Sequence, residues 1–429
     1  MDSLRVLVLG LNYAPESTGI APYTTALAEG LATRGHQVRV LTGLPHYPQW
    51  KVAPGYEAGL TEIDSPGRPH VDHLLHHVPS PPGLPGRIRM ELSFGSRLCR
   101  TPWGAPDVVL CVSPALLATA MAIARARSIR YRPMVGLWVQ DLYGLGVAET
   151  GAARGIAATL LRALESKVLR AADGVVVIHD RFKDHMVRDL GVQANSITVI
   201  RNWTHLQPAV CADRAEARRK RGWPDDVTVA LHAGNMGAKQ GLDNVIQAAK
   251  MAESLDAPVR FVLLGDGNQR AKLEQLAAGV TTLELIDPLP DAEYQAALAA
   301  ADVLLVNEKA SVAEMAVPSK ITSYFTTGNP VIAATSANSI TASEITRSGG
   351  GLVIAPENPS ELLAAVQRLR TDRLLARRLG NAGMTFRTEI LSEQQAIDSF
   401  EKWLTDLAAR LHHGRRTDEG TQRQCENVL

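Results

Sequence analysis

The sequence predicts an α/β protein of two doubly wound domains, each with a parallel sheet covered by helices on both faces. The chain has 429 residues, which is long for one hydrophobic core, so two domains are the default expectation. Short runs of Val, Ile and Leu alternate with amphipathic stretches along the chain. A polar loop near residues 203–213 interrupts this alternation, after which the same pattern starts again.

The first half contains apolar runs that are predicted to be strands. They are continuously apolar, as expected when helices cover both faces of a parallel sheet. The runs are RVLVLGL, QVRVLTG, PDVVLCVS, MVGLWV, GVVVIHD and ITVIRN. Helices are predicted between them, at the helical spacing of Ile20, Tyr23, Leu27 and Leu31, after Pro114, and around residues 160–169. We predict an N-terminal domain over residues 1–205.

The second half repeats the pattern and predicts a C-terminal domain over residues 206–390. Its expected strands are VTVALHAG, VRFVLLGDG, TTLELID, ADVLLVN, NPVIAAT and GLVIAP. An amphipathic segment over residues 391–413 is expected to form a helix that packs back on the N-terminal domain. The polar tail, residues 414–429, is expected to be disordered.

Composition excludes several classes of protein. Lys and Arg number 45 against 44 Asp and Glu, so the net charge is +1, which disfavours a nucleic-acid binder. The four cysteines are widely spaced without a C-x-x-C pair, which argues against a zinc site or a disulfide framework. No apolar run is long enough to span a membrane, and the N-terminus does not read as a signal peptide. We therefore expect a cytoplasmic protein.

The glycine-rich stretch LHAGNMGAKQG, residues 231–241, follows a predicted strand and fits neither the dinucleotide-binding nor the P-loop formula. Ligands of parallel sheets collect at the carboxyl ends of strands, and between two such domains the natural site is a cleft. Glycines let backbone N–H groups converge on an anion, and Lys239 adds a full charge. A diphosphate would fit this loop, although an ordinary strand-to-helix turn with a solvated lysine fits the pattern equally well.

Two further segments bear on the same ligand. In VPSKITSYF, Pro318 and Ser319 suit a helix start, which places Lys320 in the first turn, where a cation opposes the helix dipole. A cation in this position makes sense if an anionic ligand binds beside it. Asp266 and Gly267, in LLGDGN, end another strand and are candidates for a nucleotide pocket, although such turns are also common connectors.

Four ordered motifs together resemble the family-four glycosyltransferases of the GT-B fold. They are NYAPESTGIAPYTTALAEGLATRGHQVRVLTGLPHYPQW, HAGNMGAKQGLDNVIQAA, LLGDGNQRAKLE and VPSKITSYFTTGNPVIA. The resemblance covers about residues 5–411 and is strongest to the fucosyltransferase type found in colanic acid clusters. It implies two Rossmann-like domains facing across a cleft, a nucleotide-diphospho-sugar donor bound mainly by the C-terminal domain, and a saccharide or polyprenyl-linked acceptor. It also implies transfer with retention, without a metal or another cofactor.

The resemblance carries roles onto individual residues. Lys239 and Lys320 would neutralise the leaving diphosphate, and Asp141, in WVQDLYG, would lie beside the transferred sugar, although Asp141 also suits a helix cap. His46 and Tyr47, in LPHYPQW, would line the acceptor side, or they form a proline-rich turn with packed aromatics. The implied donor-binding residues are Gly19, Gly234, Asn235, Met236, Gly237, Gly241, Asp266, Gly267, Glu314, Ser319 and Ser323.

The chain departs from the broad family pattern at several of these positions. Asn235 stands where many members carry an arginine, and Gln240 separates Lys239 from the glycine that usually follows it. The glutamate that binds the donor ribose in many members is Ser323 here, and Glu314 lies beside the position of its usual partner. Since the colanic-acid-like branch shares the Pro-Ser-Lys form, we take Ser319 and Lys320 as its substitute.

Residues 83–104 form a basic, apolar segment that is a candidate membrane contact. It carries four arginines against Glu91, among leucine, isoleucine, methionine and aromatic side chains. Such a composition suits an anionic lipid surface, and it equally suits an amphipathic helix that packs on its own domain.

Two other activities stay compatible with the pattern. A non-hydrolysing nucleotide-sugar epimerase shares the GT-B architecture and needs no acceptor. A catalytically silent sugar-nucleotide sensor would bind donor without turnover. A nicotinamide-linked dehydrogenase is disfavoured because the first strand lacks G-x-G-x-x-G.

Overall fold

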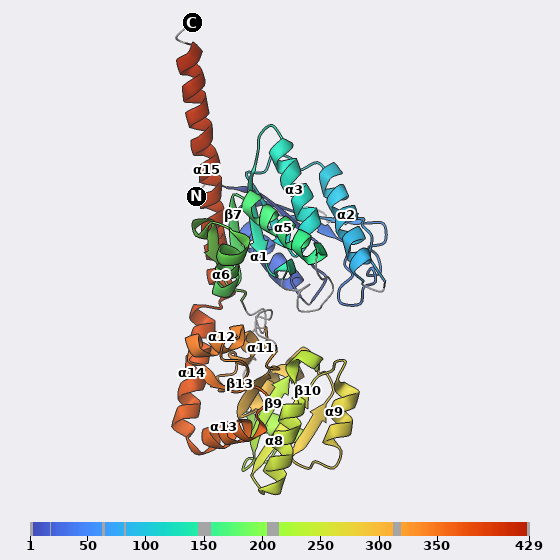
Figure 1. Ribbon diagram of the computed structural model, residues 1–429, viewed down its shortest axis with the longest axis vertical. Helices are drawn as coiled ribbons and strands as arrows, with labels where there is room; N and C mark the ends of the chain where they lie inside the picture. The colour runs from blue at the N-terminus through green and yellow to red at the C-terminus, as the bar shows by residue number, and fades with distance from the viewer. Residues whose placement is uncertain are drawn as a thin grey trace. The chain divides into compact units, whose positions relative to one another are not determined.

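The computed structural model describes residues 3–17, 19–61, 65–80, 83–144, 156–203, 214–311 and 319–426. The chain divides into two compact units, shown in Figure 1. The N-terminal unit comprises Met1–Asn202 together with Glu393–Leu429, and the C-terminal unit comprises Trp203–Ser392. Each unit is described by itself below.

The N-terminal unit is built on an eight-stranded sheet of order β3-β4-β2-β1-β5-β6-β7-β8, in which β3 is antiparallel to β4 and the other pairs are parallel. The strands are β1 (Arg5–Gly10), β2 (Gln37–Gly43), β3 (Leu60–Thr61), β4 (His70–Leu74), β5 (Val108–Ser113), β6 (Met134–Val139), β7 (Gly174–Val177) and β8 (Ile197–Val199). The helices are α1 (Ala21–Thr33), α2 (Leu84–Arg100), α3 (Leu116–Ser128), α5 (Ile156–Ala171), α6 (Asp180–Leu190) and the 3-10 turn η1 (Ala194–Ser196). The strands predicted from apolar runs are all present, because β1, β5, β6 and β7 are almost wholly buried.

Strand β4 was not predicted, because its sequence HVDHL mixes apolar residues with histidine and aspartate. Its Asp72 is nevertheless buried, and accepts hydrogen bonds from Arg39 Nε and Nη2 at 3.0 and 2.7 Å and from Thr61 Oγ1 at 2.8 Å. The Arg39 and Thr61 hydrogen bonds hold the pKa of this carboxyl below its usual value despite burial. Side chains on β2 and β3 therefore stabilise a strand that could not be predicted from its own sequence.

The C-terminal unit is built on a six-stranded, wholly parallel sheet of order β11-β10-β9-β12-β13-β14. Its strands are β9 (Thr228–Ala233), β10 (Val259–Leu264), β11 (Leu283–Ile286), β12 (Val303–Asn307), β13 (Val331–Ala334) and β14 (Gly351–Ile354). Its helices are α7 (Arg214–Arg221), the 3-10 turn η2 (Ala238–Gln240), α8 (Asp243–Ser254), α9 (Arg270–Ala277), α10 (Asp291–Ala300), α11 (Ser319–Tyr324), α12 (Ile340–Ser348), α13 (Pro359–Thr371) and α14 (Arg373–Glu389). Two buried clusters, one on each face of the sheet, confirm the predicted doubly wound domain.

The last helix, α15 (Glu393–Glu426), packs on the N-terminal unit against α1 and β6. Phe400 meets Trp138 of β6 edge-on, with ring centroids 4.7 Å apart. Gly136 of β6 leaves room for Trp403, whose ring would lie 2.5 Å from a Cβ at that position. The helix continues to Glu426, into the tail expected to be disordered; that tail is rich in Arg, Gln and Glu, which propagate a helix well once it has started.

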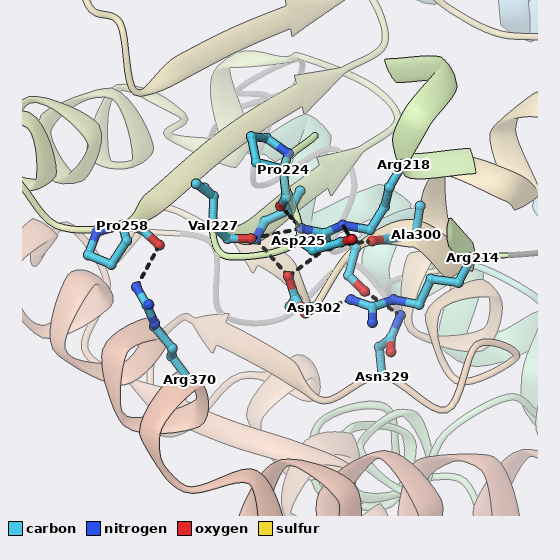
Figure 2. A network of polar contacts seen from close by, with 12 residues as sticks. Arg214, Arg218, Pro224, Asp225, Val227, Pro258, Ala300, Asp302, Asn329 and Arg370 are labelled. Carbon is cyan, nitrogen blue, oxygen red and sulfur yellow. Dashed lines mark hydrogen bonds and ion pairs between the residues drawn. The ribbon is translucent and has the colours of Figure 1, made fainter. Parts of the chain in front are cut away.

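A buried arginine joins α7 to the amino ends of the C-terminal strands (Figure 2). Arg218 Nη1 donates to Asp302 Oδ2 at 3.0 Å and to the Ala300 carbonyl at 3.1 Å, while Nη2 donates to the Val227 carbonyl at 2.8 Å. Asp302 Oδ2 also accepts from the backbone N–H of Val229 at 2.9 Å. The charge is thus paired and hydrogen-bonded at the edge opposite the glycine-rich loops.

Candidate active site

The N-terminal sheet has a pocket of about 320 Å³ at the carboxyl ends of its strands. The strand order reverses between β1 and β5, which is where parallel sheets usually bind ligands. Loops after β1, β2, β5 and β6 line the pocket together with α2. The lining residues are Leu11, Asn12, Gly19, Ile20, His46, Tyr47, Trp50, Arg87, Met90, Glu91, Pro114, Ala115, Asp141 and Tyr143.

Buried Glu16 fixes two of these loops to each other. Its Oε1 accepts from the backbone N–H groups of His46 and Tyr47 at 2.7 and 2.8 Å, and its Oε2 accepts from Asn12 Nδ2 at 2.8 Å. Gly19 has φ +68°, and a Cβ there would lie 3.3 Å from Tyr47 Cε1. The carboxylate and the glycine therefore let the loop after β2 lie against the loop after β1.

The histidine of the pocket has a defined tautomer. His46 Nδ1 lies 2.7 Å from the carbonyl of Leu44, and since a carbonyl only accepts, Nδ1 carries the hydrogen. In the neutral form of the ring, Nε2 is then the acceptor nitrogen. The ring is buried and lies against Trp50, with ring centroids 5.6 Å apart.

Helix α2 supplies a charged wall. The guanidinium of Arg87 lies over the ring of Trp50, 5.0 Å from its centroid. Buried Glu91 accepts from the backbone N–H of Leu117 at 2.7 Å, and burial raises the pKa of its carboxyl to about 7 although hydrogen bonds, including one from Tyr143, oppose the shift. The pocket therefore joins aromatic faces with groups that bind hydroxyls, which is the chemistry a saccharide requires.

Asp141 lies on the loop after β6, at the wall of this pocket. Glu165 holds the following residues in place, accepting from the N–H groups of Tyr143 and Gly144 at 2.6 and 3.0 Å. Burial raises the pKa of the Glu165 carboxyl. The loop that presents Asp141 is thereby fixed to α5.

In the C-terminal unit, the glycine-rich loop after β9 packs on the loop after β10. Met236 N–H donates to the Asp266 carbonyl at 2.8 Å. Gly234 has φ +121° and Gly265 has φ +133°, and a Cβ on Gly265 would lie 2.0 Å from the Gly234 carbonyl oxygen. A Cβ on Gly267 would lie 2.6 Å from Met236. Glycine is required at these points because two backbones approach each other closely.

The rest of the same loop is attached to the end of β12. Asn307 Nδ2 donates to the carbonyls of Gln240 and Gly241 at 2.6 and 2.9 Å, and Lys309 N–H donates to the Lys239 carbonyl at 3.0 Å. Gly241 has φ +51° and ends the short turn η2. Lys239 is exposed on that turn. The strand order reverses between β9 and β12, so this loop lies at the switch point of its sheet.

The side chain of Lys320, near the start of α11, also lies at the carboxyl edge of the C-terminal sheet. Its Nζ lies 3.0 Å from Nε2 of His232, and a Cβ on Gly234 would lie 3.0 Å from its Cε. Burial lowers the pKa of the Lys320 ammonium to about 8, and the charge of Glu308 opposes that shift. A largely buried cation therefore lies beside the first glycine of the loop.

Glu308 follows β12 and is buried with hydroxyl partners. Its Oε2 and Oε1 accept from Thr335 Oγ1 at 2.6 Å and from Thr341 Oγ1 at 2.7 Å. Burial raises the pKa of this carboxyl, while both hydroxyls and Lys320 lower it. The carboxyl ends of β9, β10, β12 and β13 thus carry glycine turns, a cation and a buried acid.

Comparison with known proteins places these features in a family. A family model described as a glycosyl transferase 4-like domain matches residues 18–203, and one described as glycosyl transferases group 1 matches residues 213–386. An Escherichia coli K12 protein, named as a colanic acid biosynthesis glycosyl transferase, WcaI, is 31% identical over 382 residues, covering 85% of this chain and 92% of the relative. The chain is a family-four glycosyltransferase.

Solved structures agree on the fold of this glycosyltransferase. Sucrose-phosphate synthase from Thermosynechococcus elongatus gives a TM-score of 0.70 at 17% identity, covering 95% of this chain and 100% of that chain. Anabaena HepE in complex with UDP-glucose gives 0.64 at 15% identity, covering 93% and 99%. The predicted GT-B fold of two Rossmann-like domains is confirmed.

The structure gathers the predicted site residues into two groups. Gly19, His46, Tyr47 and Asp141 line the pocket of the N-terminal unit. At the carboxyl edge of the C-terminal unit lie the residues of the glycine-rich loops and Lys320, namely Gly234, Asn235, Met236, Gly237, Lys239, Gly241, Asp266, Gly267 and Lys320. Met236 is buried there.

Three predicted donor-binding residues are less defined. Glu314 lies outside the described residues. Ser319 begins α11, and its side chain is not among those described; Ser323 is half-buried on the same helix. How the glycosyltransferase binds ribose therefore stays a prediction.

Most of the basic segment 83–104 forms α2, and one face of this helix is buried in the N-terminal unit. Met90, Phe94 and Leu98 are buried, and Gly95 lies against α3, where a Cβ would be 3.0 Å from Ala118 Cα. Ile88 and Leu92 remain 39% and 45% exposed on the outer face, among exposed arginines. In the described part of the chain, no helix has the length and apolar composition needed to cross a bilayer.

Sequence reasoning missed four charged or ionisable residues of these sites, namely Glu16, Glu91, His232 and Glu308. Glu308 directly follows a predicted strand, so the rule that ligands collect at strand ends could have found it. Glu16 lies in the loop between the first strand and helix and could have been found in the same way.

Proposed function

We propose that this glycosyltransferase moves a sugar from a nucleotide-diphospho-sugar to a saccharide or polyprenyl-linked acceptor, in polysaccharide or glycoconjugate biosynthesis. The observation that carries the proposal is Lys320, held beside the glycine turn of Gly234 at the switch point of the C-terminal sheet. Glycine turns and a cation at this place suit a diphosphate. The UDP-glucose complex of HepE and the colanic acid name of the Escherichia coli relative support the choice of donor and pathway class.

The acceptor is assigned to the pocket of the N-terminal unit. Tyr47 and Trp50 offer apolar ring faces for a sugar, while Glu91, Asp141 and His46 Nε2 can accept from its hydroxyls. The exposed outer face of α2, with Ile88 and Leu92, would lie on an anionic bilayer at the inner face of the cell membrane when the acceptor is lipid-linked.

The transfer is proposed to retain the anomeric configuration and to need no metal. The bond between the anomeric carbon and the diphosphate oxygen breaks, and the acceptor oxygen bonds to that carbon on the face the diphosphate leaves. A leaving-group phosphate oxygen takes the acceptor's proton. Lys320 and Lys239 stabilise the charge that develops on the diphosphate.

Asp141 is proposed to orient the transferred sugar. Asp141→Asn should lower kcat by up to roughly 100-fold through misplacement, without accumulation of a covalent glycosyl-enzyme in mass spectra. An inverted product anomer by NMR, or activity lost to EDTA and restored by magnesium or manganese, would contradict the mechanism.

A thermal-shift panel of GDP, UDP, dTDP and ADP tests the donor assignment. One diphosphate at 100 times its Kd should add about 2.7 kcal/mol of stability, and Lys320→Ala should reduce that gain. Donor turnover without any acceptor would instead indicate an epimerase, and binding without turnover a sensor.

Vesicle sedimentation tests the membrane assignment. We expect binding to anionic vesicles that falls as salt rises, because the charges are screened over about 10 Å at 0.1 M. Leu92→Glu should weaken it, and Leu255→Glu, at an exposed leucine of the C-terminal unit, is the matched control because it changes the net charge by the same amount. Equal binding to neutral vesicles would remove the proposed surface.

A further inference from the structure

The cation Lys320 has a neutral partner whose orientation the structure defines. His232 of β9 is fully buried, and its Nδ1 lies 3.2 Å from the carbonyl of Leu305 on β12. Because a carbonyl only accepts, Nδ1 carries the hydrogen and Nε2 carries the lone pair. Nε2 lies 3.0 Å from Lys320 Nζ, so the lysine donates and the histidine accepts.

His232 stays an acceptor across the physiological pH range. Burial and the positive charge of Lys320 hold the pKa of His232 well below its usual value, against opposing hydrogen bonds to the backbone of Leu305 and Asn235, so the ring does not take up a proton there. It cannot repel the lysine, and it cannot act as an acid. Its contribution is a fixed lone pair at a fixed place.

The side chain of Lys320 is also constrained where it passes Gly234. A Cβ on Gly234 would lie 3.0 Å from Lys320 Cε and 3.6 Å from Nζ, so the lysine chain passes directly over this glycine. Gly234 opens the glycine-rich loop, and its φ of +121° turns the backbone at that point. The hydrogens of Nζ that do not bond His232 therefore lie next to the loop assigned to the diphosphate.

We infer that His232 is a positioning residue for Lys320: its Nε2 accepts one ammonium hydrogen, which holds Nζ beside Gly234 and favours the charged form of the lysine. The inference deepens the proposed function and rests on it, because it takes Lys320 to face the leaving diphosphate. Histidine suits this task because its two nitrogens bond in opposite directions, one to β12 and one to α11.

The groups around Lys320 determine how much its charge depends on the hydrogen bond to His232. Glu308, on the loop after β12, favours the ammonium of Lys320, whereas burial opposes it. Tyr324 of α11 donates to the carbonyls of Ala233 and Leu305 at 3.1 and 3.3 Å and stays a neutral phenol. Lys239 and Asp266 are exposed at the same edge, and Lys309 is half-buried. Since burial lowers the pKa of Lys320 to about 8, any further fall would change its charge near neutral pH.

Three substitutions of His232 and one control separate positioning from packing. His232→Leu removes both nitrogens, His232→Asn keeps a group that can reach Leu305 but none that reaches Lys320, and His232→Gln places an amide oxygen near the position of Nε2. Tyr324→Phe is the control, because it removes a hydrogen bond to the same Leu305 carbonyl without touching Lys320. If His232→Leu does not fold, the asparagine and glutamine variants carry the comparison.

The first readout needs no donor or acceptor. The acylation of Lys320 by acetic anhydride in the full-length protein is followed by mass spectrometry as a function of pH. We expect the midpoint to fall by about one pH unit or more in His232→Leu and His232→Asn, because a hydrogen bond to a charged group is lost. His232→Gln should restore most of the shift, and Tyr324→Phe should leave the midpoint unchanged.

The second readout is the pH profile of glycosyl transfer and of nucleoside diphosphate binding in the same variants. The alkaline limb should move down with the acylation midpoint and return in His232→Gln. An acylation midpoint that is unchanged in both His232→Leu and His232→Asn would overturn the inference. A midpoint that moves while both profiles stay in place would support the contact but overturn the role of Lys320 in the proposed function.

Discussion

At the amino ends of the strands in both units, aspartates pair with arginines, whereas at the carboxyl end of the C-terminal sheet Lys320 bonds to a neutral histidine. Asp107, Asp173 and Asp302 each directly precede a strand. Each accepts from the N–H of the first or second residue of a neighbouring strand, at 2.9, 2.7 and 2.9 Å. Each also binds an arginine, namely Arg5, Arg127 and Arg218.

The carboxyl edge of the C-terminal sheet has the opposite character. Gly234, Gly241 and Gly265 have φ of +121°, +51° and +133°, and burial shifts the pKa of both Lys320 and Glu308 toward the neutral form. An edge whose charges are paired within the chain stabilises the fold. An edge where a buried cation bonds to a neutral histidine leaves that charge for a ligand, which is the usual mark of a site.

The largest effect on stability is expected at the amino edge of the C-terminal sheet. Arg218→Met keeps the aliphatic stem but removes a guanidinium, 3% exposed, that donates to Asp302 and to the carbonyls of Ala300 and Val227. These acceptors lose that donor, while Arg214 still binds Asp302 at 2.6 Å. We expect a loss of about 3–5 kcal/mol in the free energy of unfolding, measured by chemical denaturation. The kcat of the folded fraction should not change, and a tenfold fall in kcat would break the distinction between the two edges.

The largest effect on activity is expected at the carboxyl edge. Lys320→Ala should lower kcat by about 10²–10³-fold, because a preorganised charge facing the diphosphate is lost. The melting temperature should stay the same or rise, since a buried cation is removed. Lys272→Ala, an exposed lysine on α9, is the control. Wild-type turnover in Lys320→Ala would remove that lysine from the site.

Much of this fold could be predicted from local patterns. The strands within PDVVLCVS and ADVLLVN are almost continuously apolar because helices cover both faces, so the runs alone identify them. The aspartate before each run marks the strand start. Strand β4 could not be predicted, because the burial of Asp72 depends on Arg39, which lies 33 residues earlier in the chain.

In the candidate site, too, residues marked by local patterns could be predicted, and residues that act through distant contacts could not. Gly234, Lys239 and Lys320 could be predicted because each lies at a junction between a strand or loop and a helix, where the sequence itself shows the special residue type. His232 could not, because it lies within an apolar run and its partner is 88 residues away. Glu16 acts through His46, 30 residues further on, and only the folded chain shows that contact.

The pH dependence of Lys320 should set stability and activity against each other. Its pKa is lowered from 10.5 to about 8, so between these values the unfolded chain binds more protons at this group than the folded chain does. The contribution of Lys320 to stability therefore rises with pH over that window. Transfer should fall through about pH 8 as the charge is lost. The difference between wild type and Lys320→Met, by denaturation and by initial rates, isolates both slopes, and slopes of equal sign would contradict the assignment.

The smallest effect is expected where the amino-edge pattern is exposed to solvent. Arg5 binds Asp107 much as Arg218 binds Asp302, with Nη2 to Oδ1 at 2.7 Å, but its side chain is 51% exposed against 3% for Arg218. Water screens the pair and also satisfies both groups when the pair is broken, so Arg5→Gln should cost only about 0.2–1 kcal/mol. The backbone N–H of residue 5 still donates to Asp107 in that variant, which further limits the loss. Denaturation of Arg5→Gln beside Arg218→Met checks this, and similar losses in the two variants would mean that geometry, not burial, decides what these arginine–aspartate pairs contribute.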